Sequence, residues 1–107
     1  MKDLKIRKEI SESEEFINSL KNLRAKIDIA DHQLLETLSK RMKIADEIGR
    51  IKKSQNVAIL QTSRWNEILG KMILEGEEQG LSEEFILKLY KAIHQESINH
   101  QKKVISE

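Results

Sequence analysis

Two polar residues near the end of the chain occupy places where a helix would normally carry apolar side chains. Ile86, Leu89 and Ile93 recur at steps of three or four residues. The same rhythm continues onto Ser97 and Gln101, which puts a hydroxyl and an amide on the inward stripe of a helix. Because buried polar groups need hydrogen-bond partners, this spacing predicts a polar pocket at that stripe.

Two cations share one face of an earlier helical segment. Arg41 and Lys52 are eleven residues apart, which is three turns plus roughly 20° of an α-helix, or about 16 Å along its axis. Ala45 and Ile48 lie between them on the same face, so we expect that face to pack inward. The alternative is that both long side chains reach solvent, as basic residues commonly do.

Arg24 precedes Arg41 by seventeen residues, about 25 Å along a straight helix and roughly 100° around it. The two cannot hold one ligand from within the same helix. Arg24 is therefore either a surface residue or a group that a partner chain supplies to the site.

Arg64 and Trp65 open another predicted helix. A cation and a large ring at a helix start can line a pocket for an anion, although packing is the commoner role for tryptophan. The histidines His32, His94 and His100 share no spacing with carboxylates that is typical of a metal triad. We expect them to be ordinary surface or helix-face residues, with His94 and His100 on other faces than Ser97 and Gln101, and we predict no metal site.

The predicted inward set of Arg41, Lys52, Ser97 and Gln101 holds many donors and no carboxylate. Buried cations without an acidic partner cost several kcal/mol each. The missing anion is then a ligand. Such a site, without a nucleophile or a base, suits a small polycarboxylate whose reaction needs shape and charge stabilisation and no proton transfer.

The composition is that of a single helical domain. The chain has 107 residues, 35% of them charged and only 4% aromatic, with no proline and four glycines, which favours the all-α class. A net charge of +1 argues against a nucleic-acid partner. The absence of cysteine excludes disulfides and thiolate sites. No apolar run is long enough for a membrane span or a signal peptide, so we expect a cytoplasmic protein.

The long helix that carries both cations sets the architecture. Apolar residues at helical spacing predict one helix from about 16 to about 54, with a break near Asp28 to Asp31 or at Gly49 as the alternative. Such a helix is about 60 Å long, whereas a domain of this size has a radius of gyration near 13 Å. Its apolar stripe would lie in water unless a second chain covered it, so we expect a dimer.

Other elements flank the long helix. Residues 1–15 are dominated by charge and are expected to be a solvated extension, a linker remnant or a frayed helix ahead of a domain spanning 16–107. Residues 52–63 have the character of a loop, after which Thr62 or Ser63 caps a second helix. Gly80 is expected just beyond that helix, and Ser82 caps a third that runs to about residue 104.

Three stretches together resemble one enzyme family. They are "LRAKIDIADHQLLETLSKRMKIADEIGRIK", "QTSRW" and "GLSEEFILKLYKAIHQESINHQ", and they are similar to the all-helical AroQ class of chorismate mutases over residues 20 to about 103. The resemblance implies three helices per chain in an intertwined homodimer, and the rearrangement of chorismate to prephenate in phenylalanine and tyrosine biosynthesis without a cofactor. "QTSRW" and "IHQESINHQ" look most like mutase domains fused to a 3-deoxy-heptulosonate-7-phosphate synthase.

The resemblance also implies roles for the polar residues. Arg24, donated by the neighbouring subunit, and Arg41, from within the chain, would hold the two carboxylates of the substrate. Lys52 and Gln101 would hydrogen-bond the ether oxygen of the breaking bond. These four residues would therefore carry the catalysis.

Further residues complete the implied site, with one departure from the family pattern. Ser97 corresponds to a serine that contacts a carboxylate, and Arg64 to a supporting arginine. Where some relatives have a glutamate for the substrate hydroxyl, this chain has Trp65. Gln61 is a substitute partner for that hydroxyl, and Glu67 is a more remote one. An isochorismate pyruvate lyase, or a non-catalytic dimerisation or regulatory module, are the alternative functions.

Overall fold

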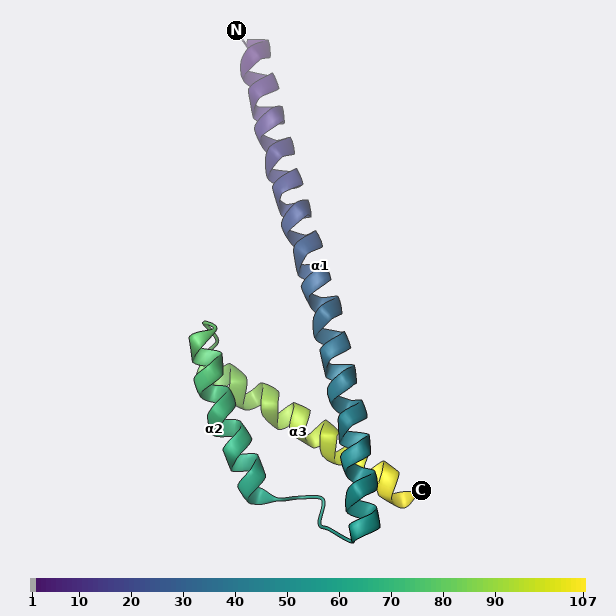
Figure 1. Ribbon diagram of the computed structural model, residues 1–107. Coiled ribbons are helices and arrows are strands. Elements are labelled where there is room, and N and C mark those ends of the chain that lie inside the picture. Colours follow the sequence, from purple (N-terminus) through teal and green to yellow (C-terminus); the bar gives the residue numbers. More distant parts are fainter. Residues whose placement is uncertain (1) are drawn as a thin grey trace. The chain divides into compact units, whose positions relative to one another are not determined.

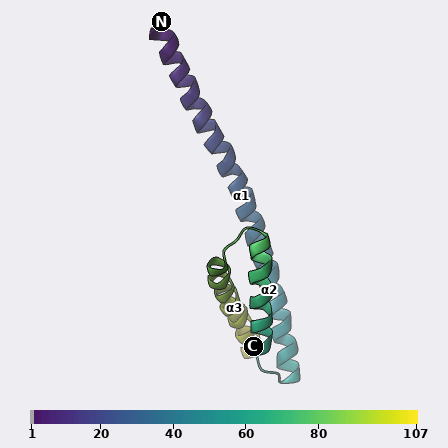
Figure 2. The same ribbon diagram turned by 90° about the vertical axis from the view of Figure 1, so that its left-hand side faces the viewer.

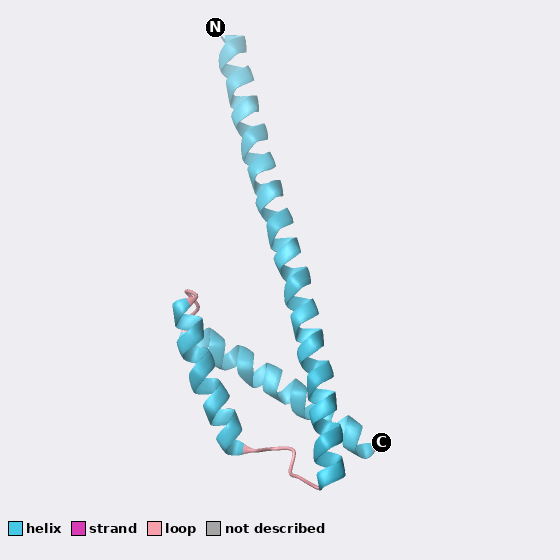
Figure 3. Ribbon diagram, viewed as in Figure 1, coloured by secondary structure: helices cyan, strands magenta, loops and turns pink. Residues whose placement is uncertain are grey.

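The protein is helical throughout the range that the computed structural model describes, which is residues 2–107 for the backbone and 12–107 for the side chains. Its elements are α1 (Lys2–Gln55), α2 (Thr62–Glu78) and α3 (Glu83–Ser106) (Figure 1). No strand occurs within this described range (Figure 3). The predicted all-α class with three helices, one of them very long, is confirmed.

Helix α1 is longer than the periodicity indicated. It begins at Lys2 and not near residue 16, and it ends at Gln55, next to the predicted end at 54. No proline occurs in the chain, and the first glycine, Gly49, costs only about 1 kcal/mol within a helix, so α1 continues through it. The alternative breaks near Asp28 or at Gly49 are wrong. The helix boundaries do not test the division into residues 1–15 and 16–107, which stays a prediction.

The chain contains two compact units, residues 1–38 and residues 39–107. The first unit is helical from Lys2 onward, and none of its described side chains, residues 12–38, is buried. Several large apolar side chains there are more than half exposed: Phe16, Ile17, Leu23, Ile27, Ile29, Leu34 and Leu35. This part of α1 therefore presents apolar surface that its own unit does not cover.

In the second unit, α2 and α3 lie side by side and run in opposite directions (Figures 1 and 2). Gly76 of α2 allows a close approach, because a Cβ atom there would lie 2.6 Å from Cγ1 of Ile86 on α3. Between the helices Gly80 adopts a φ of 80°, and the hydroxyl of Ser82 accepts a hydrogen bond from the Phe85 amide at 3.2 Å. The predicted helix stop at Gly80 and cap at Ser82 are confirmed.

The connection between α1 and α2 is shorter than predicted. The residues from Lys52 to Gln55 belong to α1, so the segment outside the helices covers only 56–61. The N-cap of α2 is Gln61, without a side-chain cap, and not Thr62 or Ser63. The reason is that the extended Gln61 already offers its carbonyl to the Trp65 amide at 3.2 Å, which places Thr62 inside the first turn.

The interior of the second unit is small and partly polar. Its buried apolar side chains are Ala45, Ile86 and Val104, and beside them Ser97 and Gln101 are only 7% and 8% exposed. The predicted inward orientation of this hydroxyl and this amide is confirmed. Polar groups at such depth need partners, and α1 supplies them.

Candidate active site

Within residues 39–107 a cavity of about 390 Å³ is lined by all three helices and the α1–α2 connection. Isoleucines and Ala45 form its apolar part. Its polar and aromatic lining consists of Arg41 and Lys52 from α1, Gln61, Arg64 and Trp65 around the start of α2, and His94, Ser97 and Gln101 from α3. Six of the seven residues predicted from the sequence therefore meet at one cavity.

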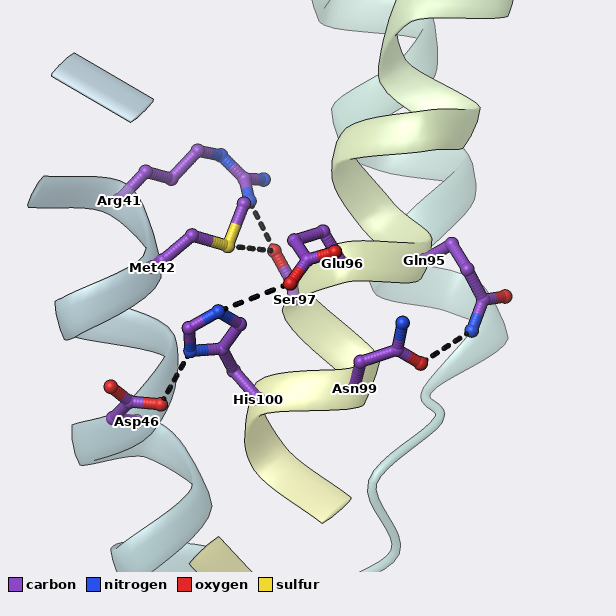
Figure 4. A network of polar contacts seen from close by, with 8 residues as sticks. All are labelled: Arg41, Met42, Asp46, Gln95, Glu96, Ser97, Asn99 and His100. Carbon is purple, nitrogen blue, oxygen red and sulfur yellow. Dashed lines mark hydrogen bonds and ion pairs between the residues drawn. The ribbon is translucent and has the colours of Figure 1, made fainter. Parts of the chain in front are cut away.

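Arg41 reaches from α1 to α3. Its Nη1 donates a hydrogen bond to the Ser97 hydroxyl at 2.5 Å, and that hydroxyl lies 3.9 Å from the sulfur of Met42 (Figure 4). The alternative that Arg41 extends into solvent is therefore wrong. Because a guanidinium carries five N–H groups in a planar fork, Arg41 keeps donors for an anion while Ser97 fixes its direction.

Lys52 is the second cation of the cavity. Its ammonium donates to the Ile59 carbonyl at 2.6 Å and to Oε1 of Gln101 at 2.9 Å. Burial lowers its pKa from the usual 10.5. Gly49 allows this arrangement, since a Cβ atom there would lie 3.0 Å from Cα of Gln101. The close approach of α3 to α1 brings the amide within reach of the ammonium.

The start of α2 forms the outer part of the cavity. Gln61 and Arg64 line it but are exposed. Nη1 of Arg64 pairs with Oε1 of Glu67 at 3.2 Å, an exposed ion pair one turn along α2. Glu67 is not among the residues that line the cavity, so the structure gives no support to it as a contact for a substrate hydroxyl.

Trp65 and His94 form one wall of the cavity. Their rings are stacked, with centroids 4.2 Å apart and an angle of 27° between the planes. The pKa of His94 is lowered, first by burial and then by the positive charges of Arg41 and Lys52. The expectation that His94 belongs to another helix face is wrong. It precedes Ser97 by three residues and Gln101 by seven, a spacing that could have identified it.

His100 lies outside the cavity and joins α3 to α1. Its Nδ1 is 2.8 Å from Oδ1 of Asp46, and its Nε2 is 3.2 Å from Oε1 of Glu96 (Figure 4). The side chain was expected to be an ordinary residue of another face, but it makes a contact between two helices one residue away from Gln101. It helps to fix how α3 lies against α1.

Arg24 is the predicted site residue that does not line the cavity. It is exposed and belongs to the unit formed by residues 1–38. This is consistent with the geometric expectation that Arg24 and Arg41 cannot serve one ligand from the same straight helix.

The charge of the cavity defines what it can bind. Arg41, Lys52 and Arg64 line it, and no aspartate or glutamate is among the described residues of its wall. Such a cavity favours anions, and fork-shaped donors favour carboxylates. None of the helices in the described part of the chain has the length and apolarity to cross a membrane. The fold and site together define an all-helical domain with a donor-rich pocket for a small organic anion.

Comparison with known proteins identifies the family. Residues 23–102 match the model of chorismate mutase type II, so the chain belongs to the chorismate mutase type II family. The predicted resemblance is confirmed at this level. No solved structure matches the chain significantly.

The chain is similar to several curated proteins. It is 29% identical to the T-protein of Haemophilus influenzae over 77% of this chain and 22% of that protein. It is 33% identical to the bifunctional chorismate mutase/prephenate dehydratase of Aquifex aeolicus over 82% of this chain and 25% of that protein. It is 32% identical to the 4-amino-4-deoxychorismate mutase of Streptomyces venezuelae over 71% of this chain and 74% of that protein. The chain thus spans about a quarter of the length of the first two.

Proposed function

We propose that this chain is a chorismate mutase, which converts chorismate to prephenate for phenylalanine and tyrosine biosynthesis. Chorismate carries two carboxylates on a ring and on an enolpyruvyl side chain, and the reaction breaks a C–O bond while a C–C bond forms in the same molecule. Arg41, held by Ser97, grips one carboxylate. Fixing both carboxylates keeps the two reacting carbons close, which removes much of the entropic barrier.

The second part of the proposal concerns the breaking bond. As the C–O bond stretches, negative charge accumulates on the ether oxygen. The ammonium of Lys52 and the amide of Gln101 lie side by side, 2.9 Å apart, and both can donate to that oxygen. Donors that are in place before the reaction stabilise the transition state more than the substrate.

The observation that carries the proposal is this pairing of Lys52 with Gln101 inside a cavity whose described wall holds no carboxylate. A reaction without a nucleophile or an external proton acceptor needs no acid in the pocket, and an acid would repel the dianion. Arg64 and Gln61 at the outer part of the cavity assist in binding. No cofactor takes part in the proposed mechanism.

A homodimer with a shared site is part of the proposal. Chorismate has a second carboxylate, and Arg24 of a neighbouring subunit is its proposed partner. The support is the apolar surface on residues 12–38, where Phe16 is 64% exposed and Leu35 is 66% exposed. A second copy of the same helix would cover that surface and bring its own Arg24.

The direct test is to incubate the purified protein with chorismate, to follow the fall in its absorbance and to identify the product. We expect prephenate to accumulate. The same protein with isochorismate tests the alternative, an isochorismate pyruvate lyase, which would release pyruvate. No conversion of either compound by a folded dimer would favour the remaining alternative, a non-catalytic dimerisation or regulatory module.

Association with a 3-deoxy-heptulosonate-7-phosphate synthase is a separate proposal. It is supported by the sequences "QTSRW" and "IHQESINHQ". The names of the relatives described above do not mention such a synthase. Cosedimentation of the chain with such a synthase would test it. The cytoplasmic location also stays a prediction.

A further inference from the structure

Trp65 and His94 are the two residues of the polar and aromatic cavity lining that the proposed mechanism does not use. They come from different helices, α2 and α3, and both line the cavity beside Arg41 and Lys52. That mechanism also assigns no contact to the ring hydroxyl of the substrate, for which the sequence suggested Gln61, an exposed residue at the outer part of the cavity. The inference below rests on the proposed function and concerns the contact of this hydroxyl.

The stacked geometry leaves the edge of the imidazole available. Nitrogen lone pairs and N–H bonds of an imidazole lie in the plane of the ring. The indole covers one face of His94 at a centroid distance of 4.2 Å, which restricts rotation of the ring without using either nitrogen. Among the described residues no buried side-chain nitrogen or oxygen lacks a hydrogen-bond partner. A ring nitrogen of His94 without a partner is therefore open to the cavity or to solvent.

The charge state of His94 suits a hydroxyl partner. Burial and the neighbouring Arg41 and Lys52 lower its pKa, so the imidazole is neutral at neutral pH. A neutral imidazole has one donor and one acceptor nitrogen. A hydroxyl can pair with either of them, whereas the cations of the cavity only donate.

We propose that the edge of His94, held in place by the stack with Trp65, is the hydrogen-bond partner of the ring hydroxyl of chorismate, and that it makes the site selective for a hydroxyl at that ring position. A substrate with an amine there carries an ammonium at neutral pH. Arg41, Lys52 and Arg64 repel that ammonium, and no described wall residue offers it a carboxylate.

The first experiment combines variants of His94 with two substrates, chorismate and an analogue that has hydrogen in place of the ring hydroxyl. We expect His94→Ala to lower kcat/KM for chorismate by roughly threefold to tenfold, the effect of one neutral hydrogen bond, and to leave the analogue unaffected. His94→Gln should recover much of the loss because its amide can replace the imidazole edge. His94→Leu fills the space without a polar group and should not recover the loss.

The controls separate this role from packing and folding. Gln95→Ala changes the exposed neighbour of His94 and should leave both substrates unaffected. Trp65→Phe keeps an aromatic face and should lower kcat/KM only slightly. Trp65→Leu should reproduce the loss of kcat/KM seen in His94→Ala, for chorismate alone. Helix content and dimer mass are compared for every variant. An equal loss on both substrates, or recovery by leucine, would overturn the inference.

A third substrate tests the selectivity. The unaltered protein should convert chorismate at least tenfold more efficiently than 4-amino-4-deoxychorismate, and His94→Glu should shift that ratio towards the amine by a similar factor. Equal use of both substrates by the unaltered protein would contradict the proposed selectivity. If chorismate is not converted at all, the proposed function fails as well. If it is converted but the His94 variants do not distinguish the substrates, only this inference fails.

Discussion

Nζ of Lys52 and Oε1 of Gln101 lie 2.9 Å apart, and this contact determines which way the amide of Gln101 faces. An ammonium can only donate, so the oxygen of the amide turns towards it and the NH₂ group turns away. The Ile59 carbonyl, 2.6 Å from the same Nζ, holds the ammonium on a second side. Contacts within the protein thereby orient two donors in the cavity, which is the arrangement that electrostatic catalysis needs.

Replacement of Lys52 by alanine should abolish most of the turnover. We expect kcat to fall by at least about a hundredfold, the scale of losing one preorganised donor, with a smaller effect on substrate affinity. Lys53→Ala is the matched control, because it removes the same charge from the exposed neighbouring position. A folded Lys52→Ala protein with unchanged kcat in steady-state assays would contradict the role of Lys52.

Replacement of Gln101 by glutamate should change how the rate depends on pH. A carboxylate only accepts hydrogen bonds and would pair with Lys52, so we expect at least a tenfold lower kcat/KM at neutral pH. As the pH falls through the pKa of this acid, which is about 4.3 for an unperturbed glutamate, the acid is protonated and donates again, and the activity should rise. Gln101→Leu should show no such recovery. If kcat/KM depended on pH in the same way in both variants, this would count against a donor role for Gln101.

The lowered pKa of Lys52 has opposite effects on activity and on stability. The charged form is the active one in the proposed mechanism, so kcat/KM should fall as the pH rises through this pKa, which lies below 10.5. In the same range the unfolded chain binds more protons than the folded chain, so the free energy of unfolding should rise with pH, up to the unfolded pKa. Rate profiles and denaturant titrations at several pH values would show both trends.

Lys52→Arg is the control for this pH dependence. A guanidinium stays charged throughout the range, so both trends should disappear, whatever activity the variant retains. Persistence of the alkaline loss in Lys52→Arg would assign it to another group.

Gly49 and Gly70 allow a matched test of helix approach. A methyl group on Gly49 would lie 3.0 Å from the Gln101 backbone, whereas one on Gly70 would meet nothing within 4 Å. Gly70→Ala should stabilise α2 by up to about 1 kcal/mol, the propensity difference between the residues, with unchanged activity. Gly49→Ala should push α3 away from α1 and lower kcat by several fold. Equal behaviour of the two variants in denaturation and rate measurements would refute the positioning role of Gly49.

The proposed shared site predicts recovery of activity when two inactive variants are mixed. Arg24→Ala and Arg41→Ala homodimers each lack an arginine in both sites. A hybrid dimer has one site with both arginines, so random exchange should restore about a quarter of the sites. Steady-state assays before and after subunit exchange measure the recovery. Its absence, with exchange demonstrated by mass spectrometry, would argue against a site shared between two subunits.

The parts of the fold that depend on local chemistry were predictable from the sequence. Gly80 and Ser82 mark a helix stop and a helix start by their own backbone and hydroxyl chemistry, whatever surrounds them. The contact between Arg41 and Ser97 was less directly predictable from the sequence. Helical periodicity placed each on an inward face, and the family resemblance assigned both to one site.

The stack between Trp65 and His94 was not predictable in the same way. It depends on how α2 lies against α3, and that pairing depends on the contact of Gly76 with Ile86, which no local pattern indicates. The start of α1 at Lys2 was missed for another reason. Residues 1–15 are mostly charged and show no regular spacing of apolar residues, but their helix propensity suffices to continue an established helix.

The buried hydroxyl of Ser97 and amide of Gln101 also have a thermodynamic consequence. These two residues of a small interior are proposed ligand contacts, so an anion in the cavity completes the interior as well as occupying the site. A ligand that binds only the folded chain adds roughly 2.7 kcal/mol to its stability at a hundred times the dissociation constant. If the proposed function holds, the folding equilibrium of this protein depends on the concentration of its proposed substrate, and the resistance of the chain to proteolysis should rise as chorismate accumulates.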